Sequence, residues 1–220
     1  MKKYSDRRVL ILGAGGYIGP VVTEHLLSLG YSVRALDLFL FKTQSVLADF
    51  SDNPDFELVT GDHCDAALVT DALEGVSNVI ILSGLVGDPI TKKYPEASKK
   101  INEDGMQALI GLFRDRGLDR VVFVSTCSNY GLIKDGDLAG EDFELKPLSL
   151  YAKAKVAVEQ ELLGLKGTVD YHPTVFRFAT AFGLAPRMRF DLTVSQFVRD
   201  MYLGRDLLVY DAGTWRPYCH

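Results

Sequence analysis

Cysteine is scarce in this chain of 220 residues, and its three cysteines, Cys64, Cys127 and Cys219, lie far apart. Their spacing fits neither the closely paired ligands of a structural metal site nor an even set of disulfides. We therefore expect no bound metal and a protein that works in a reducing compartment, the cytoplasm.

Long apolar runs are also missing. The longest candidate, Val79–Val86, is interrupted by Ser83 and Gly84 and has the length of a strand rather than of a membrane span. The first apolar run follows a few basic residues, ends in glycines and is too short for a secretory leader. The net charge of −5 disfavours nucleic acid as the main partner. We expect neither a membrane nor a nucleic acid as partner.

Glycine is plentiful in one place, a turn between two patterned segments. The apolar run 9–12 leads into this turn, and an amphipathic run begins at Tyr17. Glycines let the backbone approach a bound group closely, and a following helix points its free N–H groups and positive dipole end at the turn. The spacing is G-x-x-G-x-x-G, and it predicts a dinucleotide cofactor held by Gly13, Gly16, Tyr17, Ile18 and Gly19.

A tight turn without a ligand would explain the glycines alone, but an acid in the next segment argues against it. Asp37 ends the strand-like run 32–36 and lies eighteen residues after Gly19. A carboxylate at this place can accept hydrogen bonds from the adenosine ribose. Its charge would repel a 2′-phosphate, and the three residues after it include no arginine. The sequence therefore predicts NAD rather than NADP.

Strand-like and helical runs alternate along the chain. Strands are expected at about 8–13, 32–37, 56–60, 79–82, 121–124 and 170–178, and helices at about 17–29, 65–74, 97–116 and 149–164. Nearly continuous apolar strands that alternate with helices indicate a parallel sheet covered on both faces. With right-handed crossovers this is an α/β fold with a doubly wound parallel sheet, the Rossmann arrangement, whose ligands bind at the carboxyl ends of the strands.

Groups suited to proton transfer follow the fifth predicted strand. Tyr151 and Lys155 are four residues apart on the helix predicted over 149–164, so they share a face. To act as a base near neutrality, a tyrosine must lower its pKa from about 10 by about three, or about 4 kcal/mol. The Lys155 ammonium and the positive nicotinamide ring of an oxidised cofactor favour the phenolate, and the Thr126 hydroxyl can hold the substrate oxygen. The three side chains predict a proton-transfer device beside a hydride acceptor.

Asp62 follows the strand predicted over 56–60 and has two compatible interpretations. It can cap the helix that comes next, or it can reach the amino group of adenine. We expect its neighbour His63 to be a solvated loop histidine.

Together these segments resemble the extended short-chain dehydrogenase/reductase family, in particular its NAD-dependent nucleotide-sugar epimerases and dehydratases. The matching stretches span the chain: 13–19, Asp37, 61–62, Asn102 with Gly105, 125–131, Pro147 to Lys155, and 177–183. The resemblance implies that Tyr151 is the catalytic base, that Lys155 binds the nicotinamide ribose and that Thr126 is the active-site hydroxyl. It also implies that Asp37 binds the adenosine ribose, that Asp62 binds adenine and that Asn102 is a structural or cofactor-side residue.

The chain departs from the family at two places that bear on the substrate. Sugar dehydratases carry Thr-Asp-Glu where this chain has Thr126, Cys127 and Ser128, so both acids that drive water elimination are absent. Epimerases often carry an asparagine at the place of Thr180. Dehydration is therefore disfavoured, an epimerase and a keto-sugar reductase both remain open, and Thr180 is a candidate sugar contact.

The last region resembles the start of the family's substrate-binding lobe. Arg216 is expected to face the nucleotide diphosphate, because a planar guanidinium suits that task. Arg187 and Arg189 can assist it or can be solvated surface residues. We expect residues 1–178 to form an NAD-binding Rossmann domain and residues 179–220 to form part of the lobe. Family members continue further, so we expect a truncated lobe, which would limit turnover by this chain alone.

The favoured hypothesis is an NAD-dependent nucleotide-sugar epimerase or keto-sugar oxidoreductase that forms a homodimer. The helices predicted over 97–116 and 149–164 can pair between subunits through the apolar residues Leu109, Leu112, Phe113, Val156 and Leu163, although some of these must face the sheet. One alternative is a dehydrogenase or reductase of a small alcohol without a nucleotide. Another is a non-catalytic NAD-sensing regulatory protein, which would not need the intact set of Thr126, Tyr151 and Lys155.

Overall fold

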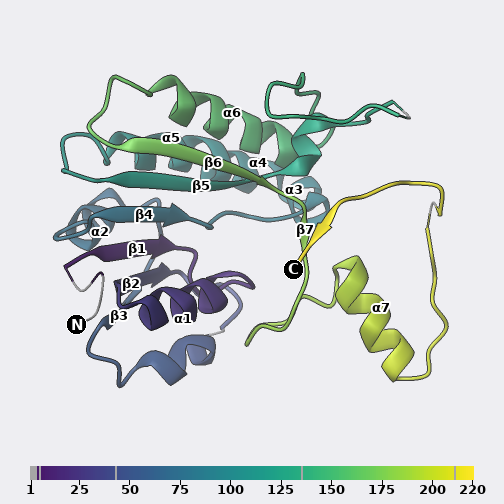
Figure 1. Ribbon diagram of the computed structural model, residues 1–220, viewed down its shortest axis with the longest axis horizontal. Coiled ribbons are helices and arrows are strands. Elements are labelled where there is room, and N and C mark those ends of the chain that lie inside the picture. The colour runs from purple at the N-terminus through teal and green to yellow at the C-terminus, as the bar shows by residue number, and fades with distance from the viewer. Residues whose placement is uncertain (1–3, 5, 43, 135, 211) are drawn as a thin grey trace.

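The computed structural model describes residues 4, 6–42, 44–134, 136–210 and 212–220, and its centre is a parallel sheet of six strands. In chain order the strands are β1 (Arg8–Leu12), β2 (Ser32–Asp37), β3 (Phe56–Thr60), β4 (Asn78–Ile81), β5 (Arg120–Thr126) and β6 (His172–Phe178). Their spatial order is β3-β2-β1-β4-β5-β6, and it reverses between β1 and β4 (Figure 1). A reversal of this kind is where doubly wound sheets bind ligands. The predicted fold class is confirmed.

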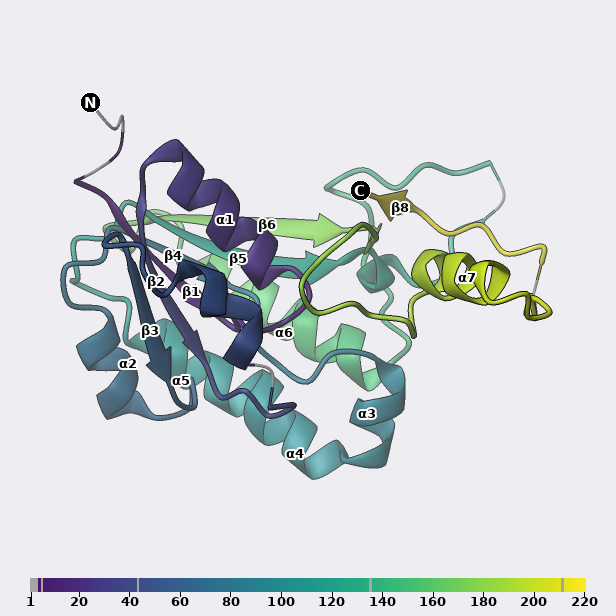
Figure 2. The ribbon, with the colours of Figure 1, turned by 90° about the horizontal axis from the view of Figure 1, so that it is seen from below.

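Helices cover both faces of the sheet, and the two faces have separate cores. On one face lie α1 (Gly19–Leu29) and the 3₁₀ helix η1 (Gln44–Phe50); on the other lie α2 (Ala66–Ala72), α5 (Gly105–Gly111) and α6 (Leu150–Gly164), as Figure 2 shows. In β1, Val9 and Ile11 pack on the side of α1, whereas Leu10 and Leu12 pack on the other side. From Val9 to Leu12 the strand is apolar, as expected for a strand with both faces buried.

The helix predicted over 97–116 is shifted and composite. It runs from Pro95 to Gly111 as α4 (Pro95–Lys99), a π-helical segment η2 (Lys100–Asp104) and α5. After Gly111 the chain tightens into turns, and Asp115 and Gly117 both have positive φ. The sequence pattern also missed the short α3 (Asp88–Lys93) and the 3₁₀ helices η1 and η3 (Cys127–Tyr130), because such elements are too short to show a period.

After β6 the chain leaves the main sheet. It forms β7 (Thr180–Ala181), α7 (Thr193–Tyr202) and β8 (Tyr218–Cys219), and β7 pairs with β8 in a separate two-stranded sheet. Helix α7 projects from the body of the molecule (Figure 1). Within the described residues, no helix combines the length and the apolar character that crossing a bilayer requires.

The apolar side chains named for a helix-to-helix dimer contact mostly belong to the core. Leu109, Phe113 and Val156 are buried, and Leu112 is partly buried against the same core. Leu163, by contrast, is 40% exposed. The three buried residues are therefore among those that pack inside the subunit, as the prediction allowed for part of the set, and the homodimer itself stays a prediction.

Candidate active site

One cleft, with a volume of about 820 Å³, lies where β1, β2, β4 and β5 end. Every site residue predicted from the sequence lines it. The glycine turn and the acids contribute Gly13, Gly16, Tyr17, Ile18, Gly19, Asp37 and Asp62; β5 and α6 contribute Thr126, Tyr151 and Lys155; the last region contributes Thr180, Arg189 and Arg216. The fold thus brings segments that are far apart in the sequence to one cleft.

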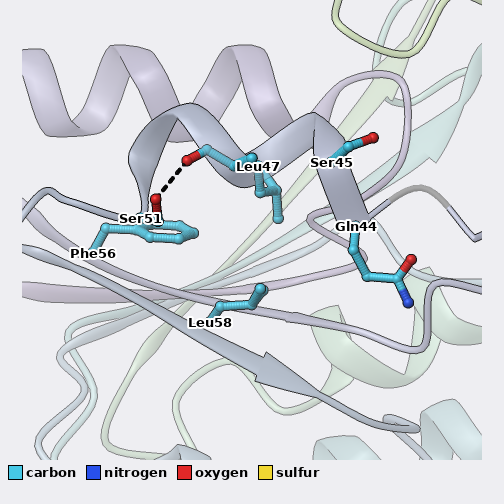
Figure 3. A pocket seen from close by; sticks show the side chains of 7 residues that line it. Gln44, Ser45, Leu47, Ser51, Phe56 and Leu58 are labelled. Carbon is cyan, nitrogen blue, oxygen red and sulfur yellow. Dashed lines mark hydrogen bonds between the residues drawn. The ribbon is translucent and has the colours of Figure 1, made fainter.

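A second hollow, of about 390 Å³, lies between η1 and β3 (Figure 3). Leu47, Phe56 and Leu58 point into it, and beside them the Ser51 hydroxyl donates to the carbonyl of Ala48 at 2.7 Å. None of its lining residues carries an ionisable side chain. This hollow therefore lacks the acid or base that proton transfer requires, and the larger cleft is the candidate site.

The three spaced glycines of the turn have different roles. Gly13 has φ +86°, and a Cβ there would stand 2.5 Å from the backbone nitrogen of Ser83. A Cβ at Gly19 would stand 2.2 Å from the carbonyl oxygen of Ala14. At Gly16 a Cβ would meet only the Gly13 carbonyl oxygen, at 3.4 Å, and this residue faces the cleft. The outer glycines therefore allow close packing, and the middle one leaves room for a ligand.

The amino end of α1 is open toward the cleft. Its N-cap residue is Ile18, which supplies no side-chain hydrogen bond. Among the hydrogen bonds of the described residues, none uses the backbone N–H of Tyr17 or Ile18. Unused N–H groups at the positive end of a helix form a site for an anion such as a pyrophosphate.

Asp37 ends β2 and is tied to the glycine turn. One carboxylate oxygen accepts the N–H of Gly15 at 2.8 Å, and the other accepts the N–H of Phe39 at 2.6 Å. These bonds hold the charged carboxylate at the cleft wall and leave it further lone pairs for a ligand.

Two interpretations of the segment after β3 are wrong. Asp65, not Asp62, caps α2, while Asp62 accepts the N–H of Cys64 at 2.9 Å. His63 is only 9% exposed rather than solvated, and burial lowers its pKa. The ligand atoms of Asp62, His63 and Cys64 lie within 4.8 Å of one another, but burial and the Asp62 charge raise the pKa of Cys64 to about 11, which disfavours a metal-binding thiolate.

Tyr151 and Lys155 reach the cleft from the first turns of α6. The Ser149 hydroxyl caps this helix by accepting the N–H of Ala152 at 3.1 Å. The Lys155 Nζ lies 5.9 Å from the centre of the Tyr151 ring and donates to the carbonyl of Val124 at 2.9 Å. Burial of the ammonium lowers the pKa of Lys155 to about 8. The lysine is therefore charged near neutrality but loses its proton more readily than a surface lysine.

Thr126 ends β5 beside these two residues. Its hydroxyl oxygen accepts the N–H of Ser128 at 3.2 Å and so caps η3, which turns the chain away from the sheet. The threonine, tyrosine and lysine all line the same cleft, and their role in proton transfer stays a prediction.

Asn102 holds a loop that lines the cleft, and the sequence pattern does not reveal these contacts. Its side chain accepts the N–H of Leu85 at 2.8 Å and donates to the carbonyl of the same residue at 2.9 Å. The residue lies in the π-helical segment η2, and segments of this kind are frequent at functional sites. Asn102 therefore has a structural role, because it holds the loop 82–87 that lines the cleft.

The last region forms the remaining wall. The Tyr17 hydroxyl donates to the carbonyl of Gly183 at 2.6 Å and joins the glycine turn to this region. The Arg216 Nε donates to the Thr180 hydroxyl at 3.0 Å, so two of the predicted substrate residues contact each other. Arg189 binds Asp191 through two nitrogens, at 2.8 and 2.6 Å.

Known proteins include two with similar sequences and a solved structure that is similar in both sequence and fold. Low-salt glycan biosynthesis protein Agl12 from Haloferax volcanii is 27% identical over 94% of this chain and 66% of that protein. A 3 beta-hydroxysteroid dehydrogenase/Delta 5-->4-isomerase from Mycobacterium tuberculosis is 28% identical over 73% of this chain and 43% of that protein. The structure of MoeE5 in complex with UDP-glucuronic acid and NAD is 27% identical, with a TM-score of 0.82, over 97% of this chain and 68% of that chain.

The chain therefore spans less than two thirds of the length of the two relatives. Nearly the whole chain, residues 9–220, matches the model of one family. This protein belongs to the NAD dependent epimerase/dehydratase family.

Proposed function

We propose that this chain acts in an NAD-dependent nucleotide-sugar epimerase or keto-sugar oxidoreductase. The observation that carries the proposal is the convergence of Thr126, Tyr151 and Lys155 with the glycine turn on one cleft of about 820 Å³. A cleft of that volume is in the range of small-molecule sites.

The residues of the cleft fit NAD. The open face of Gly16 and the unused N–H groups of Tyr17 and Ile18 suit a pyrophosphate. Asp37 would accept the adenosine ribose hydroxyls and would repel the 2′-phosphate of NADP, and Asp62 would accept the adenine amino group. When bound, NAD supplies a hydride acceptor that can also return the hydride.

The proton chemistry belongs to residues of this chain. We assign Tyr151 as the base that takes the proton of a sugar hydroxyl while the carbon is oxidised. The positive charge of Lys155, beside the tyrosine ring, favours the phenolate, and Lys155 would also bind the nicotinamide ribose. The Thr126 hydroxyl would donate to the substrate oxygen and hold it near the base.

Two features support a nucleotide sugar as the substrate. Arg189 and Arg216 bring guanidinium groups to the cleft, where they can bind a diphosphate, and Thr180 lies beside Arg216. The similar structure of MoeE5 holds UDP-glucuronic acid, and Agl12 is named for glycan biosynthesis.

The type of reaction is indicated by Cys127, which occupies the place of a dehydratase acid. Burial raises the pKa of its thiol, so no ionised acid stands there. Epimerisation or reduction is therefore favoured over dehydration.

A dehydrogenase or reductase of a small alcohol without a nucleotide is the second candidate. The similarity to a 3 beta-hydroxysteroid dehydrogenase/isomerase favours it, because the substrate named there carries no nucleotide. The cofactor half of the cleft would serve either substrate. The two candidates differ in whether Arg189 and Arg216 bind a diphosphate.

We also propose the larger assembly of the protein. Strand β6 ends at Phe178 and the β7–β8 pair is separate from the main sheet, which supports an NAD-binding domain over 1–178 and a substrate lobe that begins at 179. The homodimer and the cytoplasmic location stay predictions. All three cysteines are free, as a reducing compartment would keep them.

A thermal-shift screen tests the choice of substrate. With NAD present, UDP-glucuronic acid, dTDP-glucose, GDP-mannose and CDP-glucose are added in turn. A ligand at a hundred times its Kd should raise Tm by about 5–10 °C, and the shift should be lost in Arg216→Ala. A shift with a hydroxysteroid, and with none of the nucleotide sugars, would favour the second candidate instead.

A further inference from the structure

A buried polar network lies behind the wall that carries Tyr151 and Lys155. Glu159 follows Lys155 by four residues, just as Lys155 follows Tyr151, so all three lie on one face of α6. Tyr151 and Lys155 line the cleft, whereas Glu159 is 1% exposed. Its carboxylate is therefore available only to the protein interior.

Glu159 joins α6 to two other elements. Its Oε2 accepts a hydrogen bond from the Asn129 side-chain amide (Nδ2) at 3.1 Å. Asn129 lies in η3, the short helix that begins directly after Thr126. Its Oε1 accepts the Arg177 Nε at 2.8 Å and also pairs with the Arg177 Nη2. Because Arg177 lies on β6, the helix, the turn after β5 and the edge strand all meet at this carboxylate.

The orientation of Asn129 follows from its partners. An ionised carboxylate can only accept, so the amide nitrogen must face Glu159. The same nitrogen donates to the Ser125 hydroxyl at 2.9 Å, while the Asn129 Oδ1 is buried without a hydrogen-bond partner in the described part of the chain. A buried unpaired oxygen lowers stability. Buried polar atoms normally have hydrogen-bond partners, and exceptions to this rule are expected at functional sites.

We propose that the bond between Asn129 and Glu159 is a positioning device for the reaction. It fixes η3, and with it Thr126, relative to the helix face that carries Tyr151 and Lys155. The ion pair of the buried Glu159 with the partly exposed Arg177 ties α6 to β6, and such a pair can specify geometry while adding little net stability. Asn129 and Glu159 act through the three residues at the cleft, and this inference rests on the function proposed above.

Two substitutions in the same turn separate positioning from stability. Asn129→Ala removes the direct bond to Glu159, together with the bond to the Ser125 hydroxyl, and leaves the pair of Glu159 with Arg177 in place. Tyr130→Phe is the matched control, because it removes only the hydroxyl that accepts from Arg177 at 3.0 Å. On the nucleotide sugar that wild type turns over, Asn129→Ala should lower kcat by about 10–100-fold, as expected for a small misplacement, with the Kd for NAD within about twofold. Tyr130→Phe should leave kcat within about twofold.

A crystal structure of Asn129→Ala supplies a readout that needs no turnover. We expect Thr126 to move relative to Lys155, whose Nζ stays on the Val124 carbonyl. If wild type turns over no nucleotide sugar, the proposed function fails, and the position of Thr126 still decides the positioning claim. An unmoved Thr126, an unchanged kcat in Asn129→Ala, or an equal loss of kcat in Tyr130→Phe would overturn it.

Discussion

The carboxylate of Asp37 accepts the backbone N–H of Gly15 at 2.8 Å, so the acid at the end of β2 holds the glycine turn at the end of β1. The two residues lie 22 positions apart, and the parallel register of β1 and β2 brings them together. Under the proposed function, Asp37 would therefore act on NAD in two ways, through its own charge and through the shape of the turn.

Substitutions at Asp37 separate these two effects. Asp37→Asn keeps an oxygen for the Gly15 N–H but loses the charge, so it should narrow the preference for NAD over NADP with a modest loss of NAD affinity. Asp37→Ala also loses the tie to the turn and should weaken NAD by about tenfold or more, since hydrogen bonds to charged groups contribute about 1.5–3 kcal/mol. Calorimetric titration of both cofactors measures the preference. A wild-type protein that prefers NADP would contradict the role of Asp37.

Lys155 should make stability depend on pH. Its folded pKa is about 8, below the unfolded value near 10.4, so between these pH values the unfolded chain binds more protons. The contribution of Lys155 to the free energy of unfolding therefore rises with pH over this window, and below about pH 8 the cost of burying the charge is complete.

Lys155→Met isolates this contribution. Methionine has a similar length and no charge, so the variant should be more stable than wild type near pH 7 by up to about 3 kcal/mol, less about 1 kcal/mol for the lost bond to Val124. The advantage should shrink as the pH approaches about 10. Urea denaturation of both proteins at several pH values checks it. If the two proteins differed in free energy of unfolding by the same amount at every pH, burial would not destabilise the Lys155 ammonium.

Asn102 should matter for both stability and cofactor binding. Asn102→Leu removes both hydrogen bonds to Leu85 and leaves that backbone unpaired, at a cost of about 2–4 kcal/mol for the two groups. The loop 82–87 would then loosen and NAD affinity should fall. Asn78→Ala is the control, because that amide bonds only the neighbouring Ser77 hydroxyl among the described residues. Denaturation and NAD titration of the two variants should differ clearly; equal effects would deny Asn102 a role in shaping the cleft.

The homodimer prediction now has a narrower basis. Leu163 is the exposed member of the apolar set, so a subunit contact through α6 should depend on it. Light scattering of wild type should show a dimer at high micromolar concentration, and Leu163→Glu should shift it to monomer. A wild-type chain that remains monomeric at that concentration would count against the dimer.

Much of the site could be predicted because its signals are local. The spacing of Gly13, Gly16 and Gly19 and the four-residue interval from Tyr151 to Lys155 are readable from short segments. The carboxyl ends of parallel strands meet at one edge, so placing these segments after strands was enough to place them in one cleft.

The rest depends on packing between distant segments. The burial of His63 was missed because it arises from surrounding tertiary packing. Asp62 was considered as the cap of α2, but the backbone path after β3 makes Asp65 the N-cap residue instead. Glu159, however, lies at the next four-residue interval after Lys155, and the same helical spacing could have identified it.

The central claim is that Tyr151 is the base of an NAD-dependent reaction, and Tyr151→Phe tests it most directly. Phenylalanine keeps the ring but lacks the oxygen that carries the proton. On a nucleotide sugar that stabilises the wild type with NAD, turnover should fall by about 10²–10⁴-fold while NAD affinity stays nearly unchanged. Lys155→Ala should lower both, since it removes a ribose contact as well as the charge beside the phenol. A Tyr151→Phe protein that keeps most of the wild-type rate would contradict the assignment of the base and the catalytic scheme built on it.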